Sequence, residues 1–290
     1  MKQRELIHNT NWDIIIFLDA VRFDYFERYY DDIFGDKGKL TKVISPATFT
    51  YGWMVETFEG TEPMKDVIFV SSDYEVANSK GIKPGGRTKN NIRDFTKRLK
   101  YNHSDLDTKD YFGKIVDLWE YGYDENLGAI PPETVTNVGI EMLKKYPNKR
   151  YIIYYWQIHD PYLYFLKKGE THKEITSRVN AVYKWTNLKN LINKFISDET
   201  FWTIKEKFGI ESKGLAETWL KYGRSGIIKG YAEDLIYTLK NVKKMIDMFP
   251  NKKFVITTDH GELLGEYGKY GHAPSKRYKE LIEVPWYEVN

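Results

Sequence analysis

Residues 12–19, Trp-Asp-Ile-Ile-Ile-Phe-Leu-Asp, decide how the chain is expected to fold. The run is short, apolar and rich in β-branched side chains, and it ends abruptly on Asp19. This pattern is typical of a buried parallel strand that passes into a loop at its carboxyl end. Four similar runs occur at residues 42–44, 66–70, 151–156 and 253–258. Each of them predicts a further short strand of the same sheet.

Helical patterns separate these runs, and the two clearest cover residues 133–146 and 231–248. Two prolines directly before the first pattern mark its start. The alternation of strand and helix predicts an α/β fold, a doubly wound and mostly parallel sheet flanked by helices. A last short run at residues 284–287 is expected to add an edge strand, because proline is tolerated there.

The chain is interpreted as one α/β domain over residues 1–290. Two stretches, at about residues 80–128 and 164–225, are longer than ordinary connections between helices and strands. We therefore expect them to be inserts that lie over the site.

Composition restricts the classes of function. With 41% hydrophobic and 29% charged residues, the chain is a folded protein rather than a disordered tail or a fibre. The absence of cysteine excludes disulfides, thiolate nucleophiles and cysteine-ligated metals. The net charge of +3 creates no overall field for nucleic acid, so no nucleic-acid partner is expected. No early apolar run approaches the ~20 residues of a membrane helix, so we expect no signal peptide or transmembrane segment and a cytoplasmic location.

The residues that follow the predicted strands include Asp19, Thr50, His159, Asp259 and His260. Loops at the carboxyl ends of parallel strands meet at one edge of the sheet, so these side chains are expected to converge. Two carboxylates, an imidazole and a hydroxyl suit Zn²⁺, Mn²⁺, Mg²⁺ or Ca²⁺ better than a soft metal. Such an ion would lower the pKa of a threonine hydroxyl, which is otherwise a poor nucleophile.

Each residue also has an ordinary structural interpretation. Asp19 can cap a helix or bond a loop, His159 can belong to a turn, and Thr50 can be a cap. Arg22 either clamps an anion or pairs with a nearby acid. It is the joint occurrence of these residues after successive strands that favours a catalytic site.

Three motifs resemble those of the alkaline phosphatase superfamily, and within it the sulfatase-like hydrolases and phosphotransferases. They are residues 17–25 (Phe-Leu-Asp-Ala-Val-Arg-Phe-Asp-Tyr), 159–162 (His-Asp-Pro-Tyr) and 257–265 (Thr-Thr-Asp-His-Gly-Glu-Leu-Leu-Gly). The stretch from Tyr278 to Pro285 is similar to the aromatic and acidic stretch that these proteins carry before Val-Pro. The resemblance implies an α/β sheet with flanking helices and a metal-activated Ser, Thr or formylglycine nucleophile.

The resemblance also implies roles for single residues. The family's nucleophile lies ten positions before a glycine, and counting back from Gly60 gives Thr50, with Thr48 and Ser45 as alternatives. Asp19, Asp259 and His260 match metal ligands, with Thr50 as an additional ligand. His159 matches a histidine that contacts the transferred group or the leaving oxygen, and His272 stands where relatives carry Lys or His. Both are expected to line the wall opposite the metal.

A single divalent metal ion is expected. Two-metal members of the superfamily need a further aspartate and two more histidines. Once His159, His260 and His272 are assigned, the remaining histidines are His8, His103 and His172, in the amino-terminal tail and the predicted inserts.

The predicted function is a metal-dependent hydrolase or transferase of phosphate esters with a threonine nucleophile. Sulfate esters are less favoured, because the family's sulfatases make formylglycine from Cys or Ser. The substrate class is a small-molecule or a glycan- or lipid-linked ester. A catalytically inactive binding or scaffold protein and a phosphomutase are the alternatives, and the sequence leaves the oligomeric state open.

Overall fold

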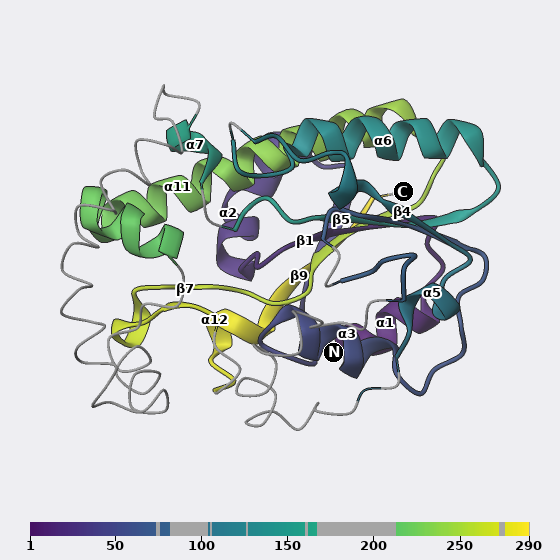
Figure 1. Ribbon diagram of the computed structural model, residues 1–290, viewed down its shortest axis with the longest axis horizontal. Coiled ribbons are helices and arrows are strands. Elements are labelled where there is room, and N and C mark those ends of the chain that lie inside the picture. Colours follow the sequence, from purple (N-terminus) through teal and green to yellow (C-terminus); the bar gives the residue numbers. More distant parts are fainter. Residues whose placement is uncertain are drawn as a thin grey trace.

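Helices cover both faces of a seven-stranded sheet in the computed structural model (Figure 1). The structure describes residues 1–73, 76–81, 104, 106–125, 127–159, 162–166, 213–272 and 276–289. The predicted α/β class with a mostly parallel sheet is confirmed. The interpretation that residues 1–290 form one domain stays a prediction.

The strand order in the sheet is β2-β9-β6-β1-β5-β3-β4. Strand β9 is antiparallel to both of its neighbours, and every other pair in this sheet is parallel. The strands are β1 (Ile14–Leu18), β2 (Gly38–Ile44), β3 (Val67–Ser71), β4 (Lys114–Asp117), β5 (Arg150–Tyr155), β6 (Phe254–Thr258) and β9 (Glu283–Val289). A separate two-stranded hairpin consists of β7 (Leu263–Leu264) and β8 (Tyr270–Gly271).

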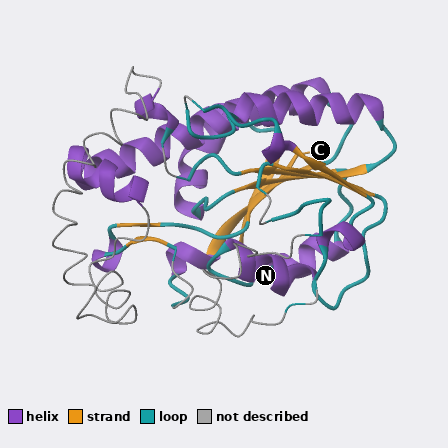
Figure 2. Cartoon of the chain, viewed as in Figure 1, coloured by secondary structure: helices purple, strands orange, loops and turns teal. Residues whose placement is uncertain are grey.

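Two helical layers enclose the sheet, as Figure 2 shows in a view coloured by secondary structure. One face carries α2 (Phe23–Phe34), α6 (Pro132–Lys145) and α11 (Lys213–Met248), and the other carries α1 (Gln3–Asn9), α3 (Thr50–Phe58) and α5 (Thr108–Tyr111). The shorter helices are η2 (Leu118–Glu120), α7 (Leu163–Leu166), η3 (Glu266–Gly268) and α12 (Lys279–Ile282). Each face of the sheet has its own apolar core cluster.

Strand β1 lies at the centre of the sheet, and all five of its residues are buried. Its two neighbours are in register with it, so Ile16 lies opposite both Ile153 of β5 and Ile256 of β6. A strand with helices on both faces has no solvent-facing side, which explains its continuous apolar sequence. The same register carries the three strand ends to one edge of the sheet.

The carboxyl-terminal run was predicted to be an edge strand, and that prediction is wrong. Strand β9 pairs on one side with β6 and on the other with β2, which is itself the edge strand. Pro285 is tolerated in this interior position. A proline has no N–H to donate, but its carbonyl oxygen can still accept. The carbonyl oxygen of Pro285 accepts a hydrogen bond from the Thr257 hydroxyl at 2.6 Å.

Parts of the predicted inserts belong to the main fold. Residues 114–117, within the first insert, form strand β4 of the main sheet. The end of the second insert belongs to α11, which begins well before the predicted 231–248 and is interrupted at Gly223, where φ is 66°. Residues 82–103 and 167–212 of these inserts lie outside the described residues.

In the part of the chain that the structure describes, no helix combines the length and the apolar character that crossing a bilayer needs.

Candidate metal centre and active site

The predicted metal ligands converge at the carboxyl ends of β1 and β6. These strands are neighbours, and Leu18 lies opposite Thr258, so the next residues, Asp19 and Asp259, leave the sheet side by side. Asp19, Asp259 and His260 are buried, and they offer ligand atoms that all lie within 4.8 Å of one another. We call these three residues the first cluster. Their separation suits a single cation, which the predicted metal site required.

Thr50 lies against the first cluster. It is the first residue of α3, and its Oγ1 is 3.1 Å from His260 Nε2. The alternative nucleophiles are placed differently. The Ser45 hydroxyl donates to the carbonyl oxygens of Ala47 and Asp259, and Thr48 is buried. Of the three hydroxyls, that of Thr50 therefore has the position expected of the nucleophile.

His260 presents a nitrogen lone pair, and not an N–H, to the two acids of the first cluster. Nδ1 lies 2.9 Å from the carbonyl oxygen of Gly261, which can only accept, so Nδ1 carries the ring proton. Burial lowers the pKa of His260 to about 4, so near neutral pH the Nε2 atom is an unprotonated lone pair. That lone pair faces Asp259 Oδ2 at 3.2 Å and Asp19 Oδ1 at 3.8 Å.

The acids of the first cluster are arranged as expected for the ligands of a cation. Asp19 Oδ1 is buried and has no hydrogen-bond partner among the described residues. Burial, and next the charge of Asp259, raise the pKa of Asp19 well above its usual value. Asp259 has hydrogen-bond donors, but Asp19 Oδ1 has none in the described part of the chain, and it lies beside a second acid and a nitrogen lone pair. Such an arrangement is unfavourable unless a positive charge joins these groups. The residues present therefore fit a divalent metal ion.

The backbone around Asp259 fixes its carboxylate. Asp259 Oδ1 accepts hydrogen bonds from the N–H groups of His260 at 2.9 Å and Ala20 at 3.2 Å. Ala20 has a φ of 57°, which is costly for a residue with a Cβ and is typical of functional sites. Gly261 is required because a Cβ there would lie 2.0 Å from the carbonyl oxygen of Glu280.

Gln3 connects the two elements that carry Thr50 and Asp259. Its fully buried side-chain amide donates to Thr257 Oγ1 at 2.8 Å and to the Thr258 carbonyl oxygen at 2.5 Å. Its carbonyl oxygen accepts a hydrogen bond from Trp53 Nε1 of α3 at 2.9 Å. The amino-terminal helix thus fixes the helix of the candidate nucleophile relative to strand β6.

A second group of possible ligands lies next to the first. His159, Glu262 and His272 offer atoms within 4.8 Å of one another, and we call them the second cluster. His272 Nδ1 is 3.0 Å from Glu262 Oε2. The ring centroids of His272 and His260 are 4.3 Å apart. Glu262 Oε1 is buried without a hydrogen-bond partner among the described residues. The predicted pair of His159 and His272 is therefore brought together beside the first cluster.

Glu262 is a site residue to which the sequence analysis gave no role. Burial by itself would raise its pKa, but the neighbouring His272 and His159 hold the pKa of Glu262 below its usual value. It follows the first cluster directly in the Asp-His-Gly-Glu motif, so the motif contained the signal. Its partner, however, is ten positions away in the chain, which spacing alone does not reveal.

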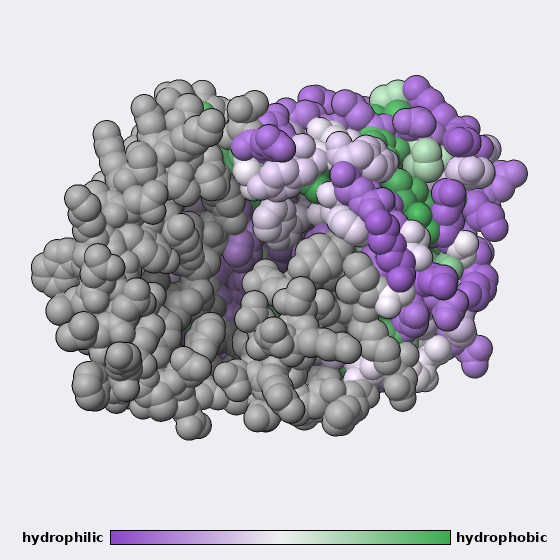
Figure 3. Space-filling view, viewed as in Figure 1, coloured by the Kyte–Doolittle hydropathy of each residue, from purple (hydrophilic) through white to green (hydrophobic). Residues whose placement is uncertain are grey.

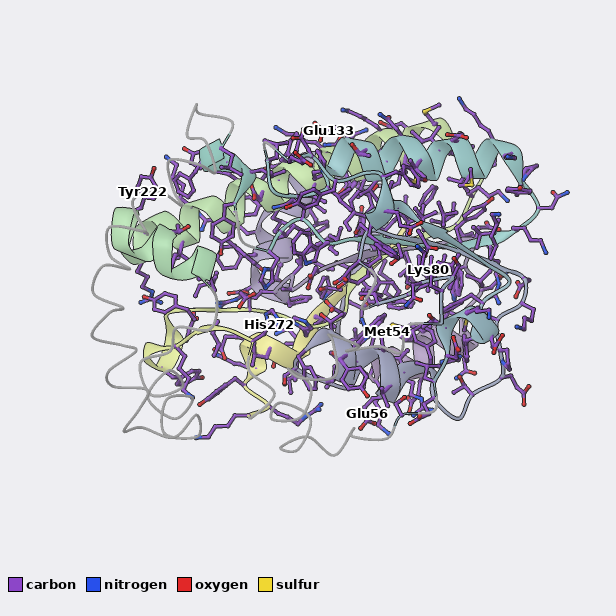
Figure 4. All side chains as sticks on the ribbon, in the orientation of Figure 1. Met54, Glu56, Lys80, Glu133, Tyr222 and His272 are labelled. Atoms are coloured by element: carbon purple, nitrogen blue, oxygen red, sulfur yellow. The ribbon has the colours of Figure 1, made fainter. Side chains whose placement is uncertain are left out.

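In Figure 4 the side chain of His272 lies between the β7–β8 hairpin and the sheet, on the side of the sheet that carries α3 and its Met54. Figure 3 shows hydrophilic side chains in a hollow near the middle of the same view.

Arg22 pairs with two acids outside the clusters, and its Nη1 also lies 3.5 Å from the backbone carbonyl oxygen of Glu262. It is buried, and its guanidinium donates to Asp24 at 2.7 and 2.9 Å and to Glu266 Oε1 at 2.8 Å. These bonds favour the structural interpretation of Arg22. Glu266 belongs to the turn between β7 and β8, so the pair ties the hairpin that precedes His272 to the first turn of α2.

We expect Glu266→Gln to lower the free energy of unfolding by about 1 kcal/mol at pH 7. Burial opposes ionisation of Glu266, but the hydrogen bonds from Arg22 and from the Leu264 N–H hold its pKa below the usual value. An acid with a lowered folded pKa adds stability above its unfolded pKa of about 4.3 and loses it as the pH falls through the folded pKa. Urea unfolding at pH 7 and pH 3 checks this. A difference between wild type and variant that is equally large at both pH values would contradict the prediction.

Comparisons with known proteins agree with this fold. Neither a protein-family model nor a curated protein matches the sequence. Among solved structures, the soluble domain of lipooligosaccharide phosphoethanolamine transferase A from Neisseria meningitidis matches with a TM-score of 0.54 and 14% identity, over 97% of this chain and 78% of that domain. The chain covers 48% of the whole integral membrane protein from the same organism.

Two further structures match at similar levels. The C-terminal periplasmic domain of EptC from Escherichia coli, solved in complex with Zn, gives a TM-score of 0.52 at 10% identity, over 100% of this chain and 75% of that one. A candidate sulfatase from Bacteroides thetaiotaomicron gives 0.52 at 12% identity, over 96% and 64%. The chain thus has the alkaline phosphatase/sulfatase-like α/β fold that the sequence motifs predicted.

Proposed function

We propose that this chain is a metal-dependent enzyme that transfers or hydrolyses phosphate esters, with Thr50 as the nucleophile. The observation that carries the proposal is the position of the Thr50 hydroxyl, 3.1 Å from His260 Nε2 at the edge of the first cluster. A scaffold protein would not need two buried acids side by side, one of them with an oxygen that has no hydrogen-bond partner among the described residues. The fold that the chain shares with phosphoethanolamine transferases and a candidate sulfatase supports the same reaction class.

Asp19, Asp259, His260 and Thr50 would hold the metal ion. When bound, the ion supplies positive charge that lowers the pKa of a hydroxyl and neutralises the oxygens of an anionic ester. The zinc complex of the E. coli protein supports a divalent metal. The metal identity stays open among Zn²⁺, Mn²⁺, Mg²⁺ and Ca²⁺.

The protein groups account for each bond that changes. Thr50 Oγ gives its proton to water and forms a bond to phosphorus as the bond from phosphorus to the ester oxygen breaks. His159 or His272, in its protonated form, gives a proton to the leaving oxygen, an effect of about 10²–10⁴-fold in rate. Water or an acceptor alcohol then attacks the phosphothreonine, and its proton passes to the histidine that was deprotonated in the first step. The bond from phosphorus to Thr50 Oγ breaks, and Thr50 takes a proton back from water.

A panel of phosphate and sulfate esters with defined metals tests the reaction class. It includes phosphoethanolamine esters, because the Neisseria relative is named for transfer of that group to a lipooligosaccharide. We expect phosphate esters to be turned over and a phosphothreonine at position 50 to be trapped by acid quench and mass spectrometry. Turnover confined to sulfate esters, or a label on another residue, would contradict the proposal.

Metal content tests the number of ions. We expect one equivalent per chain to survive dialysis, held by the first cluster, and Glu262→Gln to leave that number unchanged. Elemental analysis by mass spectrometry measures it after loading with Zn²⁺ or Mn²⁺. Two equivalents in the wild type and one in Glu262→Gln would contradict the single metal and assign an ion to the second cluster.

The predicted glycan-linked, lipid-linked or small-molecule substrate also belongs to the proposal. The cytoplasmic location stays a prediction, and the E. coli relative is described as a periplasmic domain.

A further inference from the structure

A tyrosine hydroxyl lies against the first cluster from the neighbouring strand. Tyr154 of β5 is fully buried, and its O–H donates to Asp259 Oδ2 at 3.1 Å. Oδ2 is the oxygen of Asp259 that faces His260 Nε2, at 3.2 Å. The other oxygen, Oδ1, is already bonded to backbone N–H groups. Tyr154 thus contacts the one carboxylate oxygen of Asp259 that is turned towards the metal ligands.

The ring of Tyr154 lies among apolar side chains, so its hydroxyl is the part of the side chain that a phenylalanine would lack. The ring packs in the apolar cluster between the sheet and α3, together with Phe17, Ile152 and Trp53. A phenylalanine would fill the same space with the same apolar contacts. The hydroxyl is what distinguishes tyrosine here: it donates to Asp259 Oδ2 and also lies within hydrogen-bonding reach of the Thr50 side chain.

We propose that Tyr154 is a positioning residue that holds Asp259 Oδ2 in the orientation in which the first cluster binds a metal ion. This inference rests on the proposed function, because the metal ion is the one that the first cluster would hold. A hydrogen bond to a ligating carboxylate fixes its rotation and tunes the charge that it offers to the metal. Sequence motifs give no sign of this role, because the hydroxyl reaches Asp259 only through the pairing of β1 with both β5 and β6.

The adjacent residue of the same strand is a matched control. Tyr155 is also fully buried, but its side chain lies on the other face of the sheet, where its hydroxyl is 2.8 Å from Thr136 Oγ1. Tyr154→Phe and Tyr155→Phe each remove one buried, hydrogen-bonded oxygen from β5. They differ in that only Tyr154 contacts the first cluster.

The experiment compares the two variants in metal binding and in turnover. We expect Tyr154→Phe to weaken Zn²⁺ or Mn²⁺ binding by about 10-fold or more, measured by competition with a chelator. We expect kcat to fall with little change in KM, while Tyr155→Phe leaves both metal affinity and kcat at the wild-type level. Urea unfolding of the metal-free proteins shows that the two variants are folded.

Equal metal affinities of the two variants would overturn the inference. Tyr154→His is a second variant that keeps a hydrogen-bond donor, and we expect its metal affinity to lie between those of wild type and Tyr154→Phe. An affinity at or below that of Tyr154→Phe would also count against the role. Because metal binding is measured without substrate, an absence of ester turnover in the wild type would contradict the proposed function and leave the test of Tyr154 intact.

Discussion

Thr50→Ala should lower kcat by about 10³-fold or more while the first cluster still binds metal. The reason is that Thr50 carries the hydroxyl proposed to attack, whereas the hydroxyl of Ser45, an alternative from the sequence, is already bonded to the carbonyl oxygens of Ala47 and Asp259. The variant should fold normally. Thr50 begins α3 without capping it, because the N-cap residue is Phe49, so the loss in unfolding free energy should stay within about 1 kcal/mol.

Steady-state turnover of the best phosphate ester, with metal content measured on the same sample, checks this expectation. Thr50→Ser is the conservative variant, and it should retain turnover because it keeps the attacking oxygen. Thr48→Ala is the matched control, since Thr48 is a threonine two positions away that the sequence left open as a nucleophile. Full turnover in Thr50→Ala, or a loss confined to Thr48→Ala, would contradict the role of Thr50.

The central strands could be predicted from the sequence because a strand that is buried on both faces favours apolar residues at successive positions. The runs at 14–18 and 67–70 are apolar without alternation, the run at 254–258 is apolar up to two buried threonines, and each forms a strand of the sheet. The order of the strands could not be obtained in the same way. The last run was expected at the edge because it contains Pro285, but Pro285 opposes Lys42 of a further strand, β2. The residue type limits which hydrogen bonds Pro285 can make. It does not determine which strands lie on either side of β9.

The first cluster could be predicted because its members follow neighbouring parallel strands. Such residues meet wherever the strands are paired, whatever their separation in the chain. Glu262, Gln3 and Tyr154 lie outside that rule. Glu262 acts with His272 across the β7–β8 hairpin, Gln3 reaches the site from the opposite end of the sequence, and Tyr154 precedes the end of its strand. Their contacts depend on register and on side-chain direction, which no local motif encodes.

Asp259→Asn should remove most of the metal binding and most of the stability that metal confers. The substitution keeps the shape of the side chain but removes the negative charge from the oxygen that faces His260 Nε2. Loss of partners outside the metal's own ligands already costs 10–100-fold in affinity, so loss of a ligand charge should cost about 100-fold or more. A ligand at 1,000 times its Kd stabilises the folded state by about 4 kcal/mol, and most of that stabilisation should be lost.

The same substitution should have the opposite effect on the metal-free protein. Burial and next the charge of Asp259 raise the pKa of Asp19, so without metal the charge of Asp259 opposes the ionisation of Asp19. Asp259→Asn relieves this repulsion, and the metal-free variant should be at least as stable as the metal-free wild type. Urea unfolding with and without Zn²⁺ or Mn²⁺ measures both effects.

Asp234→Asn is the matched control for this experiment. Asp234 is a buried carboxylate outside both clusters, where it accepts the N–H groups of Leu163 at 2.7 Å and Tyr164 at 2.8 Å. Its replacement should lower stability equally with and without metal, because it removes hydrogen bonds and no ligand. An increase in stability on metal addition that is as large in Asp259→Asn as in Asp234→Asn would show that the metal binds elsewhere. The buried acids at the ends of β1 and β6 would then need another explanation.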